Sequence, residues 1–296
     1  MKLNKYRQDL ITTGWEDYEL LDSGNRKKLE RFGEILLIRF EPEAPWEPRL
    51  NKSEWEKAHA EFSLEAGKKR GRWNFKKSIP DSPVLKIESY EAGLSISASR
   101  HLGIFPEQLP NWLWLEKVIK GADSRPKILN LFAYTGIATL FAAGAGAEVT
   151  HVDASKSAVN RAADNMKISG MGDAPVRWIL DDVMKFVQRE IRRGNHYDAI
   201  MMDPPLFGRG PGGEVWKFEN NIPDLFDACM HLLKYDPLFL ICTAYNIEME
   251  SFELANLLST PNTTTNIQLE YGNIIQQENS AGRMIQQAKF ARWKKI

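Results

Sequence analysis

Short apolar runs alternate with segments of helical spacing through the second part of the chain. The apolar run 127–131 leads into a turn that contains one glycine, Gly136, and a small-residue segment of helical character follows, 137–146. A second apolar run, 148–153, ends in a carboxylate at Asp153. Strands that alternate with helices are typical of βαβ units and a parallel sheet. The pattern therefore predicts an α/β domain built around these two strands.

The same alternation continues toward the C-terminus. Further strands are expected at 177–180, 197–202 and 238–243, and helices at 111–120, 154–166, 184–192 and 225–233. Three carboxylates, Asp153, Asp182 and Asp203, then stand just past three successive strand ends. An open α/β sheet binds its ligand at the carboxyl ends of its strands. We therefore expect a ligand site at this edge.

The first third of the chain has a different pattern. Strands are expected at 18–24 and 34–40, followed by a proline-broken connector, 41–48, and a helix start with a capping box at Ser53. The segments 84–90 and 94–98 alternate as strands around a turn at 91–93. We predict a small β-rich domain over residues 1–98, a candidate for substrate or RNA recognition, and an α/β domain over residues 99–296.

The turn after the first α/β strand restricts the kind of ligand. A dinucleotide fold requires G-x-G-x-x-G, but residues 133–138 contain only one glycine. Pyrophosphate needs several bare backbone amides at a helix N-terminus. A ligand without phosphates, such as S-adenosylmethionine, fits better, and Asp153 could accept hydrogen bonds from both ribose hydroxyls. The alternative is an ordinary βαβ turn in another α/β protein.

Composition adds limits on partners and location. The 296 residues are 43% hydrophobic and 26% charged, with a formal net charge of zero, so nucleic-acid binding would need a local basic patch. Two cysteines without metal-ligand spacing suit a reducing compartment. From that cysteine spacing we expect no metal site. No secretory signal or bilayer-spanning run is found, so we expect no membrane association and a cytoplasmic location. Whether the chain is a monomer or a homodimer stays open.

One local patch interleaves basic and aromatic residues over 68–77, including Arg72 and Trp73. Cations there could meet phosphates while exposed bases stack on the rings. The alternative is a solvated basic loop whose aromatic side chains are buried in the core.

Four segments together resemble a known family: 130–136, 152–155, 181–183 and the run Asp203-Pro204-Pro205-Leu206-Phe207. This set is similar to the class I S-adenosylmethionine-dependent methyltransferases. More narrowly, it resembles the bacterial family that methylates C5 of a cytosine in 23S ribosomal RNA. The resemblance implies a Rossmann-like seven-stranded sheet with helices on both faces, and a lead-in segment at 101–108 that closes over the cofactor. We expect the chain to lack the PUA domain that members of that family usually carry.

The resemblance also implies a role for individual residues. Asp203 would lie at the methyl-transfer end, and Pro204 and Pro205 would shape the floor under the substrate ring. Substrate contacts are expected from Arg72, Trp73, Phe207 and Arg209. Cofactor contacts are expected from Phe105, Gln108, Asn130, Phe132, Tyr134, Thr135, Gly136, Asp153, Ala154, Ser155, Asp182, Val183 and Asp203.

Two chemical routes remain open. Methylation of cytosine C5 needs a nucleophile, and Cys242 near the end of a late strand could supply a thiolate, or it could be an ordinary core cysteine. Transfer to a nitrogen atom needs no covalent step, because Asp203 could orient the acceptor lone pair. The glycine- and proline-rich stretch 208–216 could form a substrate lid in which Arg209 pairs with a phosphate, or it could be a flexible connector.

Three functional hypotheses follow. The leading hypothesis is an RNA methyltransferase that acts on a ribosomal RNA base. The second is a methyltransferase for a small molecule or a protein, which the neutral net charge favours. The third is a nucleotide-binding α/β protein such as a dehydrogenase, against which the missing glycine fingerprint argues.

Overall fold

The structure is a computed structural model that describes residues 3–64, 71–96, 100–258 and 266–296. The chain forms two compact units. The large unit comprises Met1–Leu10, Pro110–Ile274 and Gln287–Ile296, and the small unit comprises Ile11–Leu109 and Ile275–Gln286. The expected domain boundary between residues 98 and 99 lies outside the described residues. Each unit combines segments that are distant in sequence. The predicted division into residues 1–98 and 99–296 treats each domain as one continuous segment and does not represent this.

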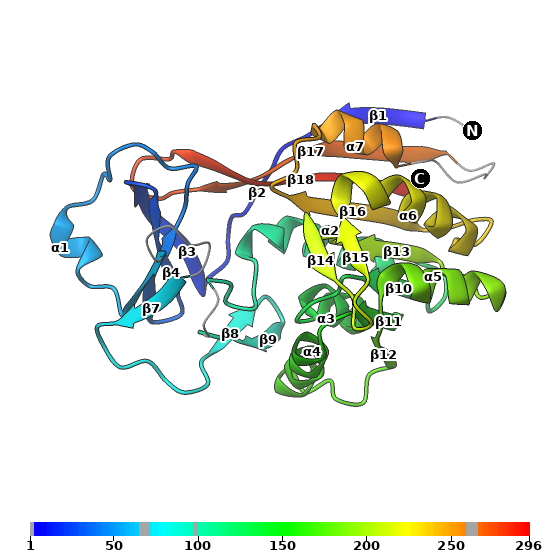
Figure 1. Ribbon diagram of the computed structural model, residues 1–296, viewed down its shortest axis with the longest axis horizontal. Helices are drawn as coiled ribbons and strands as arrows, with labels where there is room; N and C mark the ends of the chain where they lie inside the picture. The colour runs from blue at the N-terminus through cyan, green and yellow to red at the C-terminus, as the bar shows by residue number, and fades with distance from the viewer. Residues whose placement is uncertain (1–2, 65–70, 97–99, 259–265) are drawn as a thin grey trace. The chain divides into compact units, whose positions relative to one another are not determined.

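The large unit is built on a mixed sheet, which Figure 1 shows. Among the described residues, the sheet has nine strands, two more than the seven that the resemblance implies: seven follow the order β17-β18-β16-β13-β10-β11-β12, and β1 and β2 each pair with β17. The pairs among β16, β13, β10, β11 and β12 are parallel, whereas β18 is antiparallel to β16. The strands are β1 (Leu3–Arg7), β2 (Leu10–Ile11), β10 (Lys127–Leu131), β11 (Glu148–Asp153), β12 (Val176–Leu180), β13 (Ala199–Met202), β16 (Phe239–Tyr245), β17 (Ile267–Gln277) and β18 (Met284–Lys295).

Helices cover both faces of this sheet. One layer holds α2 (Leu109–Lys120), α3 (Ile137–Gly144) and α4 (Lys156–Ile168), and the other holds α5 (Val183–Arg192), α6 (Phe218–Leu232) and α7 (Ser251–Leu257). Strand β10 shows how the faces alternate. Leu129 and Leu131 join the apolar cluster with α5, α6 and α7, while Asn130 bonds to Thr139 of α3 on the other face. The continuous apolar run of β10 thus reflects burial on both faces.

The small unit contains a five-stranded sheet in the order β3-β4-β5-β6-β7. Within this sheet β5 and β6 pair in parallel, and a short helix, α1, connects these two strands. A separate hairpin, β8 with β9, and a 3-10 turn, η1, complete the described elements of this unit. Their bounds are β3 (Tyr18–Gly24), β4 (Lys27–Phe32), β5 (Ile35–Phe40), α1 (Lys52–Trp55), β6 (Ala60–Leu64), β7 (Gly71–Phe75), β8 (Val84–Ile87), β9 (Tyr90–Gly93) and η1 (Pro106–Gln108).

Three local expectations for this unit were wrong. Helix α1 has its N-cap at Asn51, without a side-chain cap bond, so the capping box at Ser53 does not form. The hairpin turn lies at Glu88 and Ser89, because Ile87 pairs with Tyr90. Glu88 has a φ of 55°, a left-handed value that a tight two-residue turn requires. The expected strand at 94–98 is absent from its described part, 94–96.

A buried cluster of charges lies inside the small unit. The Arg39 guanidinium donates two hydrogen bonds of 2.6 Å to the Glu30 carboxylate, which is fully buried. Lys28 lies 3.6 Å from Glu30 and 3.4 Å from Glu41, and the Tyr18 hydroxyl donates to Glu30 at 2.9 Å. Although burial opposes ionisation, these partners hold the pKa of Glu30 below its usual value. The carboxylate therefore stays charged within the unit.

This burial predicts a large loss of stability when one partner is removed. We expect Arg39→Met to lower the free energy of unfolding by about 3–5 kcal/mol, because it leaves a buried carboxylate without its bidentate donor. Lys57→Met is the matched control, since Lys57 pairs with Glu54 in an exposed setting, and we expect it to cost about 0–1 kcal/mol. Urea unfolding of both variants measures the difference. Equal losses would contradict the importance of the buried pair.

Candidate functional site

Strand register places the candidate residues at one edge of the large sheet. Leu131 of β10 pairs with Val152 of β11 and with Met202 of β13, so the three strands end at the same level. Asp153 pairs with Leu180 of β12. The segments that follow these strands carry Phe132, Asp153, Asp182 and Asp203. The structure thus brings together the three carboxylates that the sequence placed past successive strand ends.

The Asp153 carboxylate connects two of these strand ends. It accepts a hydrogen bond from the Tyr134 backbone N–H at 2.8 Å and another from the Ser155 backbone N–H at 2.8 Å. Burial raises the pKa of Asp153, while the backbone donors act in the opposite direction. Each carboxylate oxygen keeps a further lone pair, which suits two adjacent ribose hydroxyls. These acceptor positions on Asp153 fit a nucleoside cofactor.

The turn after β10 has a strained backbone. Phe132 and Tyr134 have left-handed φ values of 54° and 47°, which are uncommon for residues with a side chain. Gly136 follows with a φ of 77°, and a Cβ added there would lie 2.6 Å from the Ala162 Cβ. Such strain persists only where the surroundings hold it, and it gathers at functional sites. Gly136 therefore allows the turn to lie close against α4.

A chain of buried polar groups supports this turn from below. Asn130 donates to the Thr139 hydroxyl at 3.0 Å, and that hydroxyl lies 2.9 Å from His151 Nδ1. Asn165 donates to the Thr135 carbonyl at 2.8 Å. Burial lowers the pKa of His151 to about 3, so its ring is neutral at physiological pH. Asn130 and Thr135 are each 3% exposed, and the Asn130 side chain and the Thr135 carbonyl belong to this support.

Sequence reasoning missed three members of that support: Thr139, His151 and Asn165. The sequence does contain an indication of this network. These polar residues stand at positions that helix and strand periodicity assign to the core. Buried polar groups are nearly always hydrogen-bonded, and such positions therefore point to a specific network.

Two helix caps occupy the neighbouring strand ends. The Ser155 hydroxyl accepts from the Ala158 N–H and caps α4, and the Asp182 carboxylate accepts from the Lys185 N–H at 3.0 Å and caps α5. The second oxygen of Asp182 is not used by the cap. Ala154 is half-buried and Val183 is buried. Capping positions Asp182 at the edge where the family resemblance expects the adenine.

The Asp203-Pro204-Pro205 segment leads directly into a hairpin, β14 (Phe207–Arg209) with β15 (Val215–Lys217). Trp216 anchors it, since its Nε1–H donates to the Pro205 carbonyl at 2.7 Å and its ring lies 4.8 Å from the Phe132 ring. Phe207 stays 53% exposed. A large apolar ring is therefore held at the surface, next to the segment assigned to methyl transfer.

The tip of the hairpin lies against Asp182. A Cβ added to Gly210 would lie 3.1 Å from Asp182 Oδ2. Glu214 pairs with Lys185, which projects from the first turn of α5. The segment expected as a lid or a connector is thus an ordered hairpin, joined to the helix that Asp182 caps.

Cys242 lies in the interior of the sheet. It is fully buried and belongs to the apolar cluster that includes Leu240 and Ala244. Burial, followed by the negative charge of Asp203, raises the pKa of its thiol well above the usual value. A thiolate is the nucleophilic form of cysteine, and this environment disfavours it. Cys229 is also buried, and burial raises the pKa of its thiol.

Four of the expected site residues belong to the small unit. Phe105 is half-buried and Gln108 is buried in η1. In β7, Arg72 is exposed, while the half-buried Trp73 packs edge-on against Phe62 with ring centroids 5.4 Å apart. Residues 68–70 of the basic patch lie outside the described residues.

Two searches of the described residues returned no candidates. None of the helices found there is both long and apolar enough to cross a membrane. Across the same ranges, no group of three or more His, Cys, Asp or Glu side chains is placed to hold a metal ion.

The geometry agrees with comparisons to known proteins. A family model for S-adenosylmethionine-dependent methyltransferases matches residues 84–224. The crystal structure of the SAM-dependent methyltransferase from Agrobacterium tumefaciens is 39% identical, with a TM-score of 0.92 over 99% of this chain and 96% of that one. The solved structure of SMU.776, complexed with SAH, has a TM-score of 0.70 at 15% identity and shows the fold alone.

Curated relatives match over shorter stretches. The ribosomal RNA large subunit methyltransferase I of Shewanella denitrificans is 34% identical over 131 residues, which are 44% of this chain. The ribosomal RNA large subunit methyltransferase K/L of Hahella chejuensis is 28% identical over 176 residues, or 58% of this chain. These matches span 32% and 23% of the relatives' own lengths, so the similarity covers a third of those proteins or less.

Gly136 provides a test of the cofactor turn. We expect Gly136→Ala to weaken S-adenosylmethionine binding at least tenfold, because the new Cβ would displace the turn from α4; a tenfold loss corresponds to about 1.4 kcal/mol. Gly146→Ala is the matched control. Gly146 also has a positive φ, 101°, but an added Cβ there would meet nothing within 4 Å. Calorimetric titration measures both variants, and equal affinities would contradict the role of the close approach.

Proposed function

The chain belongs to the S-adenosylmethionine-dependent methyltransferases, and from that premise we propose that it methylates a base of large-subunit ribosomal RNA. Its cofactor is S-adenosylmethionine. RNA as the acceptor is an inference from the exposed chemistry beside the methyl-transfer segment, together with the names of the curated relatives. A ribosomal RNA target would place the enzyme in the cytoplasm.

The observation that carries this proposal is the exposed ring of Phe207. It stands two residues after Pro205, and Leu206 and Val215 next to it are also about half exposed. A solvent-exposed aromatic ring beside a methyl donor offers a stacking surface for an unpaired base, and stacking is worth about 1–3 kcal/mol per base. Arg209 follows on the same strand and could pair with the neighbouring phosphate.

The remaining side chains position the two reactants. Bound S-adenosylmethionine supplies an electrophilic methyl group. Asp153 would hold its ribose hydroxyls, Asp182 would accept from its adenine amino group, and the turn with Phe132 and Tyr134 would enclose its methionine part. Asp203 would accept a hydrogen bond from the acceptor base and align it. Such alignment is the main contribution that a protein makes to a transfer whose chemistry lies in the cofactor.

The acceptor chemistry follows from the position of Cys242. A covalent route would need this thiol to lose its proton and reach the substrate. Because it is fully buried and its pKa is raised, we propose that transfer proceeds without a Cys242 adduct. An exocyclic or ring nitrogen, oriented by Asp203, is the acceptor most consistent with that route.

A second candidate is a methyltransferase for a protein or a small molecule. The formal net charge of zero favours it, since many nucleic-acid enzymes use a positive field to attract their substrate. The patch around Arg72 is the local source of charge on which RNA binding would depend. Trp73 is packed against Phe62, which leaves Phe75, 55% exposed, as the ring available for stacking there.

Methyl transfer to isolated ribosomal RNA tests the proposal. With radiolabelled S-adenosylmethionine, we expect incorporation into large-subunit RNA, and we expect Phe207→Ala to lower kcat/KM at least tenfold through lost stacking. Phe252→Ala is the matched control, because Phe252 is 50% exposed on α7 and should have little effect. No incorporation of label into the RNA, with the enzyme shown to bind S-adenosylmethionine, would overturn the RNA assignment.

Cys242 gives an independent test of the route. We expect Cys242→Ala to keep kcat within about threefold of the wild-type value, with a modest loss of stability from the smaller buried side chain. Cys229→Ala in the same apolar cluster controls for the packing loss. A fall in kcat of several orders of magnitude for Cys242→Ala alone would establish the covalent route instead.

A further inference from the structure

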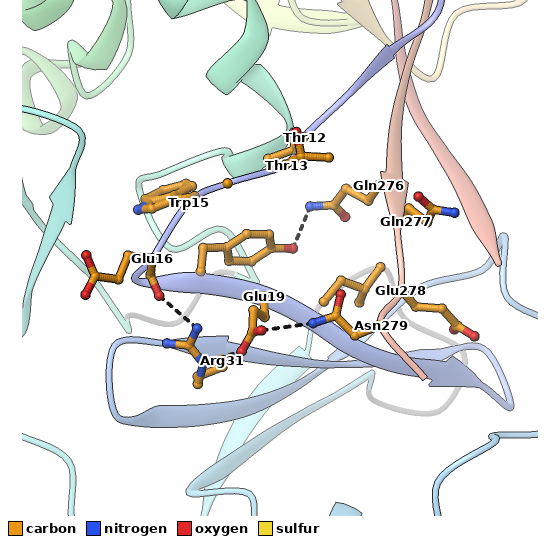
Figure 2. Close-up of a pocket in the computed structure, with 13 residues that line it drawn as sticks. Thr12, Thr13, Trp15, Glu16, Glu19, Arg31, Gln276, Gln277, Glu278 and Asn279 are labelled. Carbon is orange, nitrogen blue, oxygen red and sulfur yellow. Dashed lines mark hydrogen bonds and ion pairs between the residues drawn. The ribbon is translucent and has the colours of Figure 1, made fainter. Parts of the chain in front are cut away.

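The small unit contains a pocket that is separate from the residues assigned to methyl transfer. Its volume is about 580 Å³, which is large enough for a nucleoside. Figure 2 shows that its walls come from two segments far apart in sequence, one at 12–20 and one at 276–279. Arg31 of β4 completes the lining.

Two buried rings provide an apolar, aromatic part of the wall. Trp15 and Tyr18 are 5% and 6% exposed, and their ring centroids are 5.4 Å apart. Both rings are held by hydrogen bonds. Trp15 Nε1 donates to the Lys86 carbonyl at 2.7 Å, and the Tyr18 hydroxyl accepts from Gln276 at 2.7 Å and donates to Glu30. The aromatic wall is therefore rigid, and its polar atoms already have partners.

Gln276 connects the aromatic wall to the opposite wall of the pocket. It is 1% exposed, and its side-chain carbonyl accepts from Lys28 at 3.0 Å. The buried charge cluster of the small unit is therefore hydrogen-bonded to both walls, through Tyr18 and Glu30 on one side and through Gln276 and Lys28 on the other. These bonds hold both walls in place.

The rim carries an oriented carboxylate. Glu19 accepts from Arg31 Nε at 2.7 Å and from the Asn279 amide at 2.9 Å, as the dashed line between Glu19 and Asn279 in Figure 2 marks. These two bonds leave further lone pairs on both oxygens, side by side. The Asn279 side-chain carbonyl adds one acceptor at the same place. The Arg31 guanidinium donates to the Gly33 and Glu16 carbonyls as well, which leaves one N–H on each of its terminal nitrogens.

These features restrict the ligand. The rigid wall formed by Trp15 and Tyr18, whose rings are 5% and 6% exposed, leaves room for a flat group along their edges but offers no open stacking face. A carboxylate with two available acceptor sites favours two adjacent N–H donors. The neighbouring donors favour a carbonyl oxygen on the same ring. Guanine presents all three, with its N1–H and 2-amino group beside the O6 carbonyl. The carboxylates of Glu16 and Glu19 on the rim disfavour a phosphate inside the pocket.

We propose that this pocket binds an unstacked guanine base, with Glu19 accepting from its N1–H and 2-amino groups. The identification of this guanine as a base of the RNA substrate rests on the proposed function. In that case the small unit would help to select the RNA sequence. Recognition of RNA commonly uses splayed bases that enter such pockets. An arginine side chain of a protein is the competing ligand, since it also has a planar group with paired donors, but Arg31 on the rim and the size of the pocket disfavour it.

Calorimetric titration of the full chain with guanosine tests the proposal without requiring methyl transfer. S-adenosylhomocysteine is kept at saturation, so that the nucleoside cannot enter the cofactor site. We expect guanosine to bind, and inosine, which lacks the 2-amino group, to bind about tenfold more weakly. We also expect Glu19→Gln to weaken guanosine binding about tenfold. Glu34→Gln removes an equal charge from an exposed position outside the pocket and should leave the affinity unchanged.

A second variant fills the pocket without removing a native partner of Glu19. Thr13 is an exposed residue of the lining, and Thr13→Trp should abolish guanosine binding. Failure of guanosine to bind the wild-type chain, equal binding of guanosine and inosine, or binding of Nα-acetylarginine amide in place of guanosine would overturn the proposal. If guanosine binds as expected but ribosomal RNA is not methylated, the pocket assignment stands and the proposed RNA substrate fails.

Discussion

The hydrogen bonds of the Asp153 carboxylate are the interaction on which the site depends. This side chain ends β11, yet one of its oxygens accepts from the Tyr134 backbone beyond the neighbouring strand, β10. The bond offsets part of the cost of the left-handed conformations at Phe132 and Tyr134, which would otherwise relax. The other oxygen accepts from Ser155 and directs the chain into α4. A single carboxylate thus sets the path of two loops, and the same bonds orient the lone pairs that would meet the ribose in the proposed cofactor site.

The surroundings reinforce this arrangement from the core side. Gly136 lies so close to Ala162 that no side chain fits between them, and the Thr135 carbonyl is held by Asn165 of the same helix. The neutral His151 ring lies beneath the turn with Thr139 and Asn130. These groups are buried and bonded to one another, so disturbing one would leave its partners unsatisfied. The site is therefore rigid where the cofactor would bind, whereas apolar side chains are exposed on the adjacent hairpin.

The parallel sheet could be predicted because its strands are continuous apolar runs that end in carboxylates, and strand register alone then brings Asp153, Asp182 and Asp203 to one edge. The domain boundary could not be predicted, since residues 275–286 join the small unit through contacts with β3 that sequence order does not reveal. Helix α6 was expected to begin at Leu225, but it begins at Phe218 and contains Pro223. Burial of Phe218 and Ile222 in the core outweighs the low helix propensity of proline. The pocket at Trp15 is formed by segments that are distant in sequence, so no local sequence pattern indicates it.

The alternation of side chains along β16 decides which of its residues can reach the ligand edge. Leu240, Cys242 and Ala244 face the layer of α5, α6 and α7, and Cys242 is level with Met202, one residue before Asp203. Cys242 therefore lies one residue inside the ligand edge, on the face of the sheet that the helices cover. From there it would reach a substrate only if the ladder between β13 and β16 were broken. Asp203 follows the last residue of β13 and is therefore free of that constraint. Strand geometry, rather than the intrinsic reactivity of the two side chains, therefore supports the proposal that Asp203 and not Cys242 meets the acceptor.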